Sequence, residues 1–449
     1  MRDNFFALKA FSIGLFCKSE AVLENFGISD INIETARIFD IYKKLGAKIE
    51  ISEDKTRVES VPEDSKTPLR IDLDFIDENT GGLFAYTLLQ KRETIFYFHS
   101  QEVYRYYARL KPYMKKFGIG AVFNDNEFTL LLKPSMVYGA EIKLSAPDEL
   151  VKNFVLLTFL FARGKSVFSE DGPGNDTLER ILEYQKFSCE VKRSSFSQSV
   201  EDDPEENDEL AKRIRKIEKK KSLTESQGKT PKTVIVYGGE IPAFKTVSVP
   251  GDLNYAAHLV VLSIILKNSG ITVEGVNINS TRSRIVSILK RMGADISFKN
   301  RSVAGGALTA DIVSSTSRLK GRKIGGEDSA FIVNEIPLVS IAASFAEGET
   351  VIRNAEGLRN NNPDLISATV FNLRNMDVST GEIEDGIVLR GKKDYDGSEF
   401  FCRNSGPLST AFFAAACCCR GKSVLKDVKN ENIEYSSLIK SVNGRKTRA

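Results

Sequence analysis

Residues Phe154–Ser169 read FVLLTFLFARGKSVFS, an apolar run that passes through a Gly-containing turn into a short strand. A run that is apolar on every side predicts a helix inside a domain, because a surface helix keeps one polar face. Similar strand starts recur at Val22, Ile95, Val167, Val273, Val351 and Val424. They lie 72 to 78 residues apart, except for one step of 106 residues. A fixed spacing indicates an internal repeat, so the chain predicts six copies of one unit.

Each copy also contains a second, amphipathic helix, as in Ile285–Met292 (IVSILKRM). Several of these helices are followed by a glycine, namely Gly46, Gly118 or Gly293. Glycine readily adopts the left-handed conformation that ends a helix. Apolar first helices with strands between them predict buried helices and solvent-facing sheets. The predicted fold is therefore α/β, with two inside-out α/β barrel domains. Each domain has three copies of a βαβαββ-type unit.

The long step marks an interruption that is rich in charge and poor in apolar residues. It contains the acidic run Glu201–Glu206 and the basic runs Lys212–Lys216 and Lys219–Lys221. Such a segment buries too little apolar surface to fold alone, which predicts a flexible insertion or linker. A tail that binds nucleic acid or a partner is the alternative. The predicted division is a first domain at residues 1–195, a linker at 196–232 and a second domain at 233–449.

The composition excludes several classes of protein. The 449 residues carry a net charge of +3, which by itself does not indicate nucleic-acid binding. No apolar run is long enough to span a membrane, and the start of the chain has no signal-peptide pattern, so we expect a cytoplasmic protein. The six cysteines lack metal-ligand spacing, and two histidines are too few for a His-rich site. We therefore expect neither a metal nor a cofactor.

Two segments carry a resemblance to a known family. Asn334–Arg359 and Gly275–Ala294 closely resemble stretches of the EPSP synthases (3-phosphoshikimate 1-carboxyvinyltransferases), which belong to the enolpyruvyl transferases. The resemblance implies a cleft between two domains in which shikimate 3-phosphate reacts with phosphoenolpyruvate, in a monomer without a cofactor. Lys and Arg would hold the phosphates and carboxylates of these or related small anions. An acid and a base would move protons.

The family motifs of the first domain can be placed by counting residues. On this count the chain begins inside the N-terminal motif, whose lysine falls on Asn4. A phosphate-binding arginine is replaced by Ala85, and the motif that grips the shikimate phosphate falls on Val151–Phe154. The substrate-binding residues that the resemblance predicts in this domain are Lys9, Arg105, Lys152 and Asn153.

The second domain departs from the family pattern in a similar way. The catalytic aspartate position holds Asn334, beside Glu335, and these two are the predicted catalytic residues. Arg359 keeps a substrate-binding arginine, whereas the lysine and glutamate that follow it in the family are Asn361 and Asn362. A local ion pair between Arg359 and Asp364 is the structural alternative for the retained arginine.

These replacements predict weak or absent EPSP synthase activity. Losing one hydrogen bond to a charged group typically costs about 1.5–3 kcal/mol, and several such contacts are lost together. Two alternatives remain open. The first is a non-catalytic scaffold or ligand sensor. The second is a transferase for a less anionic substrate, which requires Lys9, Arg105, Lys152 and Glu335 to converge on one cleft.

Overall fold

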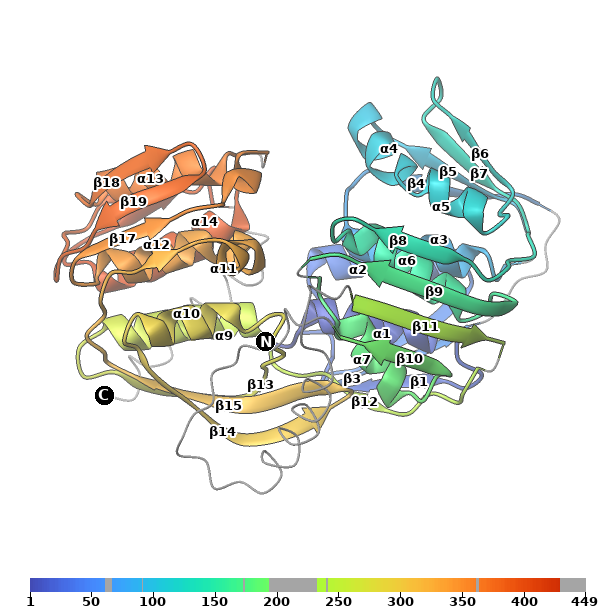
Figure 1. Ribbon diagram of the computed structural model, residues 1–449, viewed down its shortest axis with the longest axis horizontal. Coiled ribbons are helices and arrows are strands. Elements are labelled where there is room, and N and C mark those ends of the chain that lie inside the picture. Colours follow the sequence, from blue (N-terminus) through green and yellow to red (C-terminus); the bar gives the residue numbers. More distant parts are fainter. Residues whose placement is uncertain are drawn as a thin grey trace, which may run out of the picture.

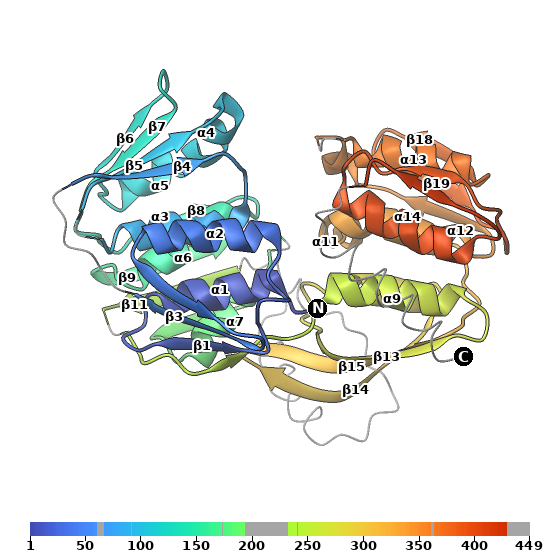
Figure 2. The same cartoon turned by 180° about the vertical axis from the view of Figure 1, so that it is seen from behind.

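The computed structural model describes residues 1–60, 67–90, 92–172, 174–193, 232–239, 241–360 and 363–428. The buried apolar side chains form two clusters, one drawn mainly from residues 6–249 and one from residues 253–415. We call these parts the first half and the second half. Figures 1 and 2 show them side by side, with helices stacked inside each half. The predicted insertion, apart from Lys232, lies outside the described residues.

The six repeated strands lie where the spacing predicts them. They are β1 (Ala21–Glu24), β5 (Thr94–Phe98), β9 (Gly164–Glu170), β13 (Gly270–Asn277), β17 (Glu349–Ile352) and β21 (Val424–Lys426). An apolar helix precedes each of them: α1 (Asn4–Gly14), α3 (Gly81–Thr87), α6 (Glu149–Phe159), α9 (Leu253–Ile265), α12 (Ile336–Ser344) and α14 (Gly406–Cys418). Every residue of α3 and α12 is buried, as expected for helices without a polar face.

The second helices of the repeats are more amphipathic. They are α2 (Ile33–Lys44), α4 (Gln101–Ala108) with α5 (Lys111–Lys116), α7 (Thr177–Tyr184), α10 (Arg284–Arg291) and α13 (Leu365–Asn375). Gly46, Gly118 and Gly293 have φ angles of 94°, 72° and 97°. The left-handed backbone at these positions confirms their predicted role as the residues that end a helix.

Among the described residues, the strands form six small sheets, most of which are mixed. The first half contains the sheets β12-β1-β3-β2, β4-β5-β7-β6 and β10-β11-β9-β8, and the second half contains β13-β15-β14, β16-β17-β19-β18 and β20-β21. The remaining strands of the first half are β2 (Ala47–Ile51), β3 (Lys55–Ser60), β4 (Leu69–Leu73), β6 (Ala121–Asn124), β7 (Thr129–Leu132), β8 (Glu141–Leu144), β10 (Cys189–Lys192), β11 (Lys232–Gly238) and β12 (Val247–Ser248). Those of the second half are β14 (Asp295–Ala304), β15 (Ala307–Ser315), β16 (Lys323–Ile324), β18 (Ser379–Ile383), β19 (Gly386–Arg390) and β20 (Glu399–Phe401). The predicted α/β class is confirmed, and the sheets are several small ones rather than one continuous barrel.

The chain returns to the first half after the gap at residues 194–231. Strand β11 pairs antiparallel with both β9 and β10, and β12 pairs parallel with β1. Val234, Val236, Val247 and Val249 are buried in the core of the first half. The predicted second domain begins at residue 233, whereas these two strands complete sheets of the first half and bury their valines in its core.

The N-terminus lies at the junction between the halves. The amide of Asp3 donates to the carbonyl of Pro250 over 3.0 Å, and the amide of Asp252 donates to the carbonyl of Met1 over 3.2 Å. Thr281 Oγ1 donates to Asp176 Oδ1 over 3.1 Å in a further contact between the halves. None of the described helices combines the length and hydrophobicity needed to cross a membrane.

Candidate functional site

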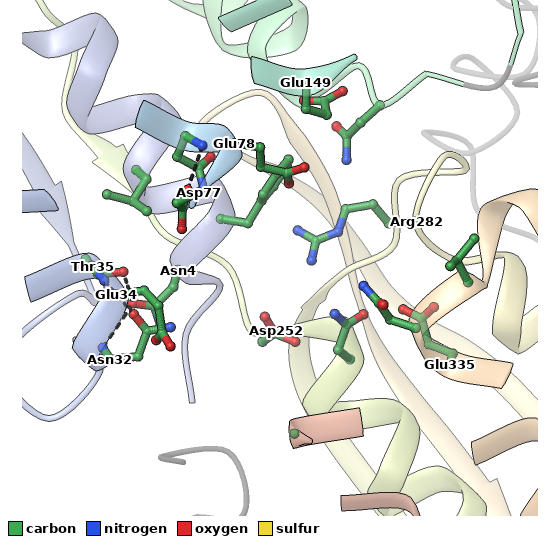
Figure 3. A pocket seen from close by; sticks show the side chains of 18 of the residues that line it. Asn4, Asn32, Glu34, Thr35, Asp77, Glu78, Glu149, Asp252, Arg282 and Glu335 are labelled. Carbon is green, nitrogen blue, oxygen red and sulfur yellow. Dashed lines mark hydrogen bonds between the residues drawn. The ribbon is translucent and has the colours of Figure 1, made fainter. Parts of the chain in front are cut away.

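A cavity of about 690 Å³ lies between the two halves and is lined by residues from both. Its wall on the first half comes from α1, the start of α2, the short 3₁₀ helix η1 (Glu78–Thr80) and the start of α6. The opposite wall comes from the residues before α9 and α10, from α11 (Glu327–Phe331), from η3 (Val333–Glu335) and from the start of α14. Figure 3 shows side chains of both walls pointing toward the space between them.

Acidic side chains dominate the lining of this cavity. The lining carboxylates are Glu34, Asp77, Glu78, Glu149, Asp252 and Glu335. Two cationic side chains line it, and both are already paired. Arg37 Nη2 lies 2.6 Å from Asp74 Oδ1, and Arg282 donates through Nη1 to Asp3. Carboxyl groups therefore outnumber cationic groups in the lining, and both of its cations are paired with carboxylates outside the lining.

Helix-capping interactions fix the acidic wall of the first half. Asp77 is the N-cap of η1 and accepts a hydrogen bond from the Asn79 amide over 2.6 Å. The carbonyl of Glu78 accepts one from Asn153 Nδ2 over 3.0 Å. Burial raises the pKa of Asp77. The pKa of Glu78 is raised to about 7, first by burial and then by the charge of Glu149.

The opposite wall holds two further carboxyl groups whose pKa values are raised. Asp252 is the N-cap of α9, accepts from the Tyr255 amide over 3.0 Å and is only 8% exposed. Burial raises its pKa, and the charge of Asp3 adds to the effect. Burial also raises the pKa of Glu335, to about 7, although Arg282 opposes the shift. Arg282 lies between the two acidic walls in Figure 3.

Of the residues predicted from the sequence, Glu335 and Asn334 line the cavity. Lys9 and Asn153 lie behind its wall and bind each other. Lys9 Nζ donates to Asn153 Oδ1 over 2.6 Å and to Glu149 Oε2 over 3.0 Å. The ammonium group of Lys9 is thus paired with Glu149, a carboxylate of the cavity lining.

Lys152 lies in a buried cluster of charges inside the first half. Its Nζ is 3.0 Å from Glu170 Oε1 and 3.0 Å from Glu179 Oε1, and Lys232 binds the same two carboxylates. Burial alone lowers the pKa of Lys152, but the charges of Glu179, Glu149 and Glu170 outweigh it and raise that pKa well above its usual value. Lys152 is not among the residues that line the cavity.

The other two predicted arginines lie elsewhere. Arg105 is exposed on α4 and does not line the cavity. Arg359 donates to Asp364 over 3.0 Å, to Glu382 over 2.6 Å and to two backbone carbonyls. The local ion pair between Arg359 and Asp364 is therefore confirmed. Lys9, Arg105, Lys152 and Glu335 do not converge on the cavity.

Sequence reasoning missed Asp77, Glu78, Asp252 and Arg282. Asp77 and Asp252 each precede a helix, so the sequence contains their capping signal. Their meeting across one cavity depends on how the two halves are placed, which no local pattern records. Asn361 and Asn362 lie outside the described residues. Within the described part of the chain, no group of His, Cys, Asp and Glu side chains is arranged to hold a metal ion.

Comparisons of the sequence agree with the resemblance. A family model described as EPSP synthase (3-phosphoshikimate 1-carboxyvinyltransferase) matches residues 223–440. The 3-phosphoshikimate 1-carboxyvinyltransferase of Thermoanaerobacter sp. strain X514 is 25% identical over 98% of this chain and 95% of its own length. The protein of the same name from Caldicellulosiruptor saccharolyticus is 27% identical over 96% of this chain and 92% of its own length.

Solved structures show the same fold. An EPSP synthase from Acinetobacter baumannii superposes with a TM-score of 0.81 at 20% identity, covering 99% of this chain and 94% of the other. The enolpyruvyl transferase NikO from Streptomyces tendae superposes with a TM-score of 0.69 at 13% identity, covering 99% of this chain and 93% of the other. At these identities the likeness concerns the fold alone.

Proposed function

We propose that the chain is a member of the EPSP synthase family, and that the cavity between its halves is its ligand site but converts phosphoenolpyruvate and shikimate 3-phosphate weakly or not at all. The observation that carries this proposal is the charge of the cavity lining. Six carboxylates face two arginines, and both arginines are paired with other carboxylates.

The family's two substrates are multiply anionic, so their binding depends on Lys and Arg side chains. Each lost hydrogen bond to a charged group costs about 1.5–3 kcal/mol, and about 1.4 kcal/mol changes an affinity tenfold. Lys9 and Lys152 cannot replace the missing contacts without leaving Glu149 unpaired and leaving Glu170 and Glu179 with Lys232 alone. Repulsion from the lining adds to the loss.

A second candidate function keeps proton transfer in the cavity. Asn334 cannot accept a proton at ordinary pH, but Glu335 beside it has a pKa raised to about 7 by burial. A carboxyl group with such a pKa can act as an acid or a base near neutral pH. The form expected from the sequence, a transferase for a less anionic substrate that uses Lys9, Arg105, Lys152 and Glu335 together, does not fit, because these side chains do not converge on the cavity. If the cavity catalyses no reaction, the chain would act as a scaffold or as a ligand sensor.

Calorimetric titration of the purified chain with shikimate 3-phosphate and phosphoenolpyruvate, followed by an assay of phosphate release, tests the proposal. The EPSP synthase of Acinetobacter baumannii is the positive control. We expect no micromolar binding and no phosphate release above background. Micromolar binding with turnover overturns the proposal. The monomeric state and the cytoplasmic location stay predictions, and size-exclusion chromatography with light scattering tests the first.

A further inference from the structure

We propose that the cavity binds a neutral molecule with several hydroxyl groups, such as a sugar or a cyclitol, through asparagine side chains on its two walls. The proposal rests on the proposed function only in taking this cavity as the ligand site. It assigns a class of ligand that differs from the anionic substrates of the family. The cavity lies between the two halves, so the ligand would contact both of them (Figure 3).

Asparagine is the commonest residue type in the cavity lining. Seven of the 24 lining residues are asparagines, whereas the whole chain has 25 asparagines among its 449 residues. The lining is therefore strongly enriched in a side chain that is polar but uncharged. Five of these asparagines carry the proposal, because their amide groups are wholly or partly free.

Three asparagines on the wall of the second half have free side-chain amides. Asn254, Asn334 and Asn404 line the cavity, and no described residue forms a hydrogen bond with their side chains. Asn334 and Asn404 are exposed, and Asn254 is half-buried. Each of these amides offers both a donor and an acceptor to a ligand in the cavity.

Two asparagines on the opposite wall are each fixed by a helix start. Asn32 Oδ1 accepts from the Thr35 amide over 2.8 Å at the start of α2, and Asn175 Oδ1 accepts from the Thr177 amide over 2.8 Å at the start of α7. The Nδ2 groups of Asn32 and Asn175 donate to no described residue. Capping therefore orients both side chains and leaves a donor of each on the cavity wall.

Amide groups match hydroxyl groups in hydrogen bonding. A hydroxyl group has one donor and two acceptor lone pairs, and an amide likewise has donors on nitrogen and an acceptor on oxygen. A phosphate or carboxylate of a ligand is bound best by charged donors, and an ammonium group needs acceptors alone. The two walls together offer five free Nδ2 groups and three free Oδ1 atoms. This mixture of donors and acceptors favours a neutral ligand over an anion or a cation.

The charged groups of the lining are compatible with a neutral ligand. The charge of Arg282 acts on Glu78, Asp252 and Glu335 together, so it compensates part of their charge. Burial raises the pKa values of Glu78 and Glu335 to about 7, so each carboxyl group is partly protonated at neutral pH. A protonated carboxyl group both donates and accepts, as a hydroxyl group does.

The size and the apolar side chains of the cavity also suit such a ligand. A volume of about 690 Å³ falls in the range of small-molecule pockets, roughly 300–1,000 Å³. Ile33 on the first half is 43% exposed and Val333 on the second half is 36% exposed, and both line the cavity. The C–H groups of a sugar or cyclitol ring can cover these side chains, which removes apolar surface from water.

Saturation-transfer-difference NMR of the full chain with D-glucose, sucrose and myo-inositol tests the proposal, and a titration of each gives its dissociation constant. We expect saturable binding of at least one of the three. Its affinity should be the same in 50 mM and in 500 mM NaCl, because salt screens only the interactions between charges. The phosphate ester of the molecule that binds should bind more weakly, because the ester adds a negative charge next to the lining carboxylates.

Variants test whether the binding takes place in the cavity. The double variant Asn254→Ala, Asn334→Ala removes two free amides and should weaken binding about tenfold. Asn126→Ala, at an exposed position in the turn between β6 and β7, is the matched control and should leave the affinity unchanged. Asn404→Gly removes a third amide and tolerates the left-handed backbone at this position, where φ is 56°. It gives an independent test if the double variant does not fold.

Four results overturn the proposal. These are the absence of saturable binding of all three molecules, an equal loss of affinity in Asn126→Ala, an affinity that changes with salt, and tighter binding of the phosphate ester. Turnover of phosphoenolpyruvate and shikimate 3-phosphate contradicts the proposed function instead. Binding of a neutral ligand and turnover of the anions are measured separately, so the two failures are distinguishable.

Discussion

Arg282 donates through Nη1 to Oδ2 of Asp3, and this ion pair joins the second half of the chain to its N-terminus. Asp3 is fully buried and has two further partners. Its Oδ1 accepts from the Phe6 amide at the start of α1, and its Oδ2 accepts from Asn277 Nδ2 over 3.0 Å. One carboxylate therefore caps a helix of the first half and holds two side chains of the second half.

Replacing Asp3 should destabilise the whole molecule. Asp3→Ala leaves Arg282 buried without its partner and removes the cap of α1. Loss of one member of a buried pair costs about 3–5 kcal/mol. We expect a decrease of that size in the free energy of unfolding measured with urea. The control is Asp72→Ala, which breaks the exposed pair with Arg70. Equal effects of the two variants would contradict the role assigned to Asp3.

Lys152 should contribute to stability rather than to ligand binding. Lys152→Met leaves Glu170 and Glu179, both 0% exposed, with Lys232 as their one close cation among the described residues. We expect the free energy of unfolding to fall by about 3–5 kcal/mol. Lys165→Met, at an exposed position, is the matched control. A stable Lys152→Met variant would show that the cluster tolerates an unpaired carboxylate.

Arg359 should act as a local structural residue. Its guanidinium joins Asp364, the N-cap of α13, to Glu382 and to the carbonyls of Ile383 and Glu384. These contacts are partly exposed, so solvent screening reduces their value, and Arg359→Ala should cost about 1–2 kcal/mol of unfolding free energy. Urea unfolding of the variant and of the parent chain measures the difference. A loss above about 3 kcal/mol would show that these contacts behave as buried ones.

The acidic cavity should make stability depend on pH in an unusual direction. The folded-state pKa of Glu335 is about 7, above the ordinary value of about 4.3, so the folded form binds the proton more tightly. Its contribution is fully present below pH 4.3 and is lost as the pH rises through 7. Glu335→Gln should therefore be more stable than the parent chain at pH 8 and similar to it at pH 5.

The comparison is made as a difference between the two proteins, by urea unfolding at each pH. Other groups that titrate in this range, such as the buried His258 with its pKa lowered to about 4 by burial, contribute equally to both proteins. A Glu335→Gln variant with no stability advantage at pH 8 would show that the charge of Glu335 is compensated.

The six repeated strands and their buried helices could be predicted because packing restricts those segments locally. A helix such as α12, buried along its whole length, has no polar face to obscure the pattern. The site could be predicted only in part. Asn334 and Glu335 were found because they follow a family motif, whereas Glu78 and Asp252 read as ordinary helix starts. Lys152 looked available for a phosphate, because its partners Glu170, Glu179 and Lys232 are distant in the sequence.

The chain returns to the first half through β11 and β12, so a cut before these strands does not separate the two halves. A cut between residues 195 and 231 would leave β11 and β12 on the C-terminal fragment, although both pair with strands of the N-terminal fragment. The turn between β14 and β15 also reaches the first half, where a Cβ on Gly305 would lie 3.0 Å from the Phe6 ring. The two fragments of a nicked chain should therefore stay assembled under native conditions and separate only in denaturant. The N-terminal fragment expressed alone would lack part of its core, because Val234, Val236, Val247 and Val249 lie on the other fragment.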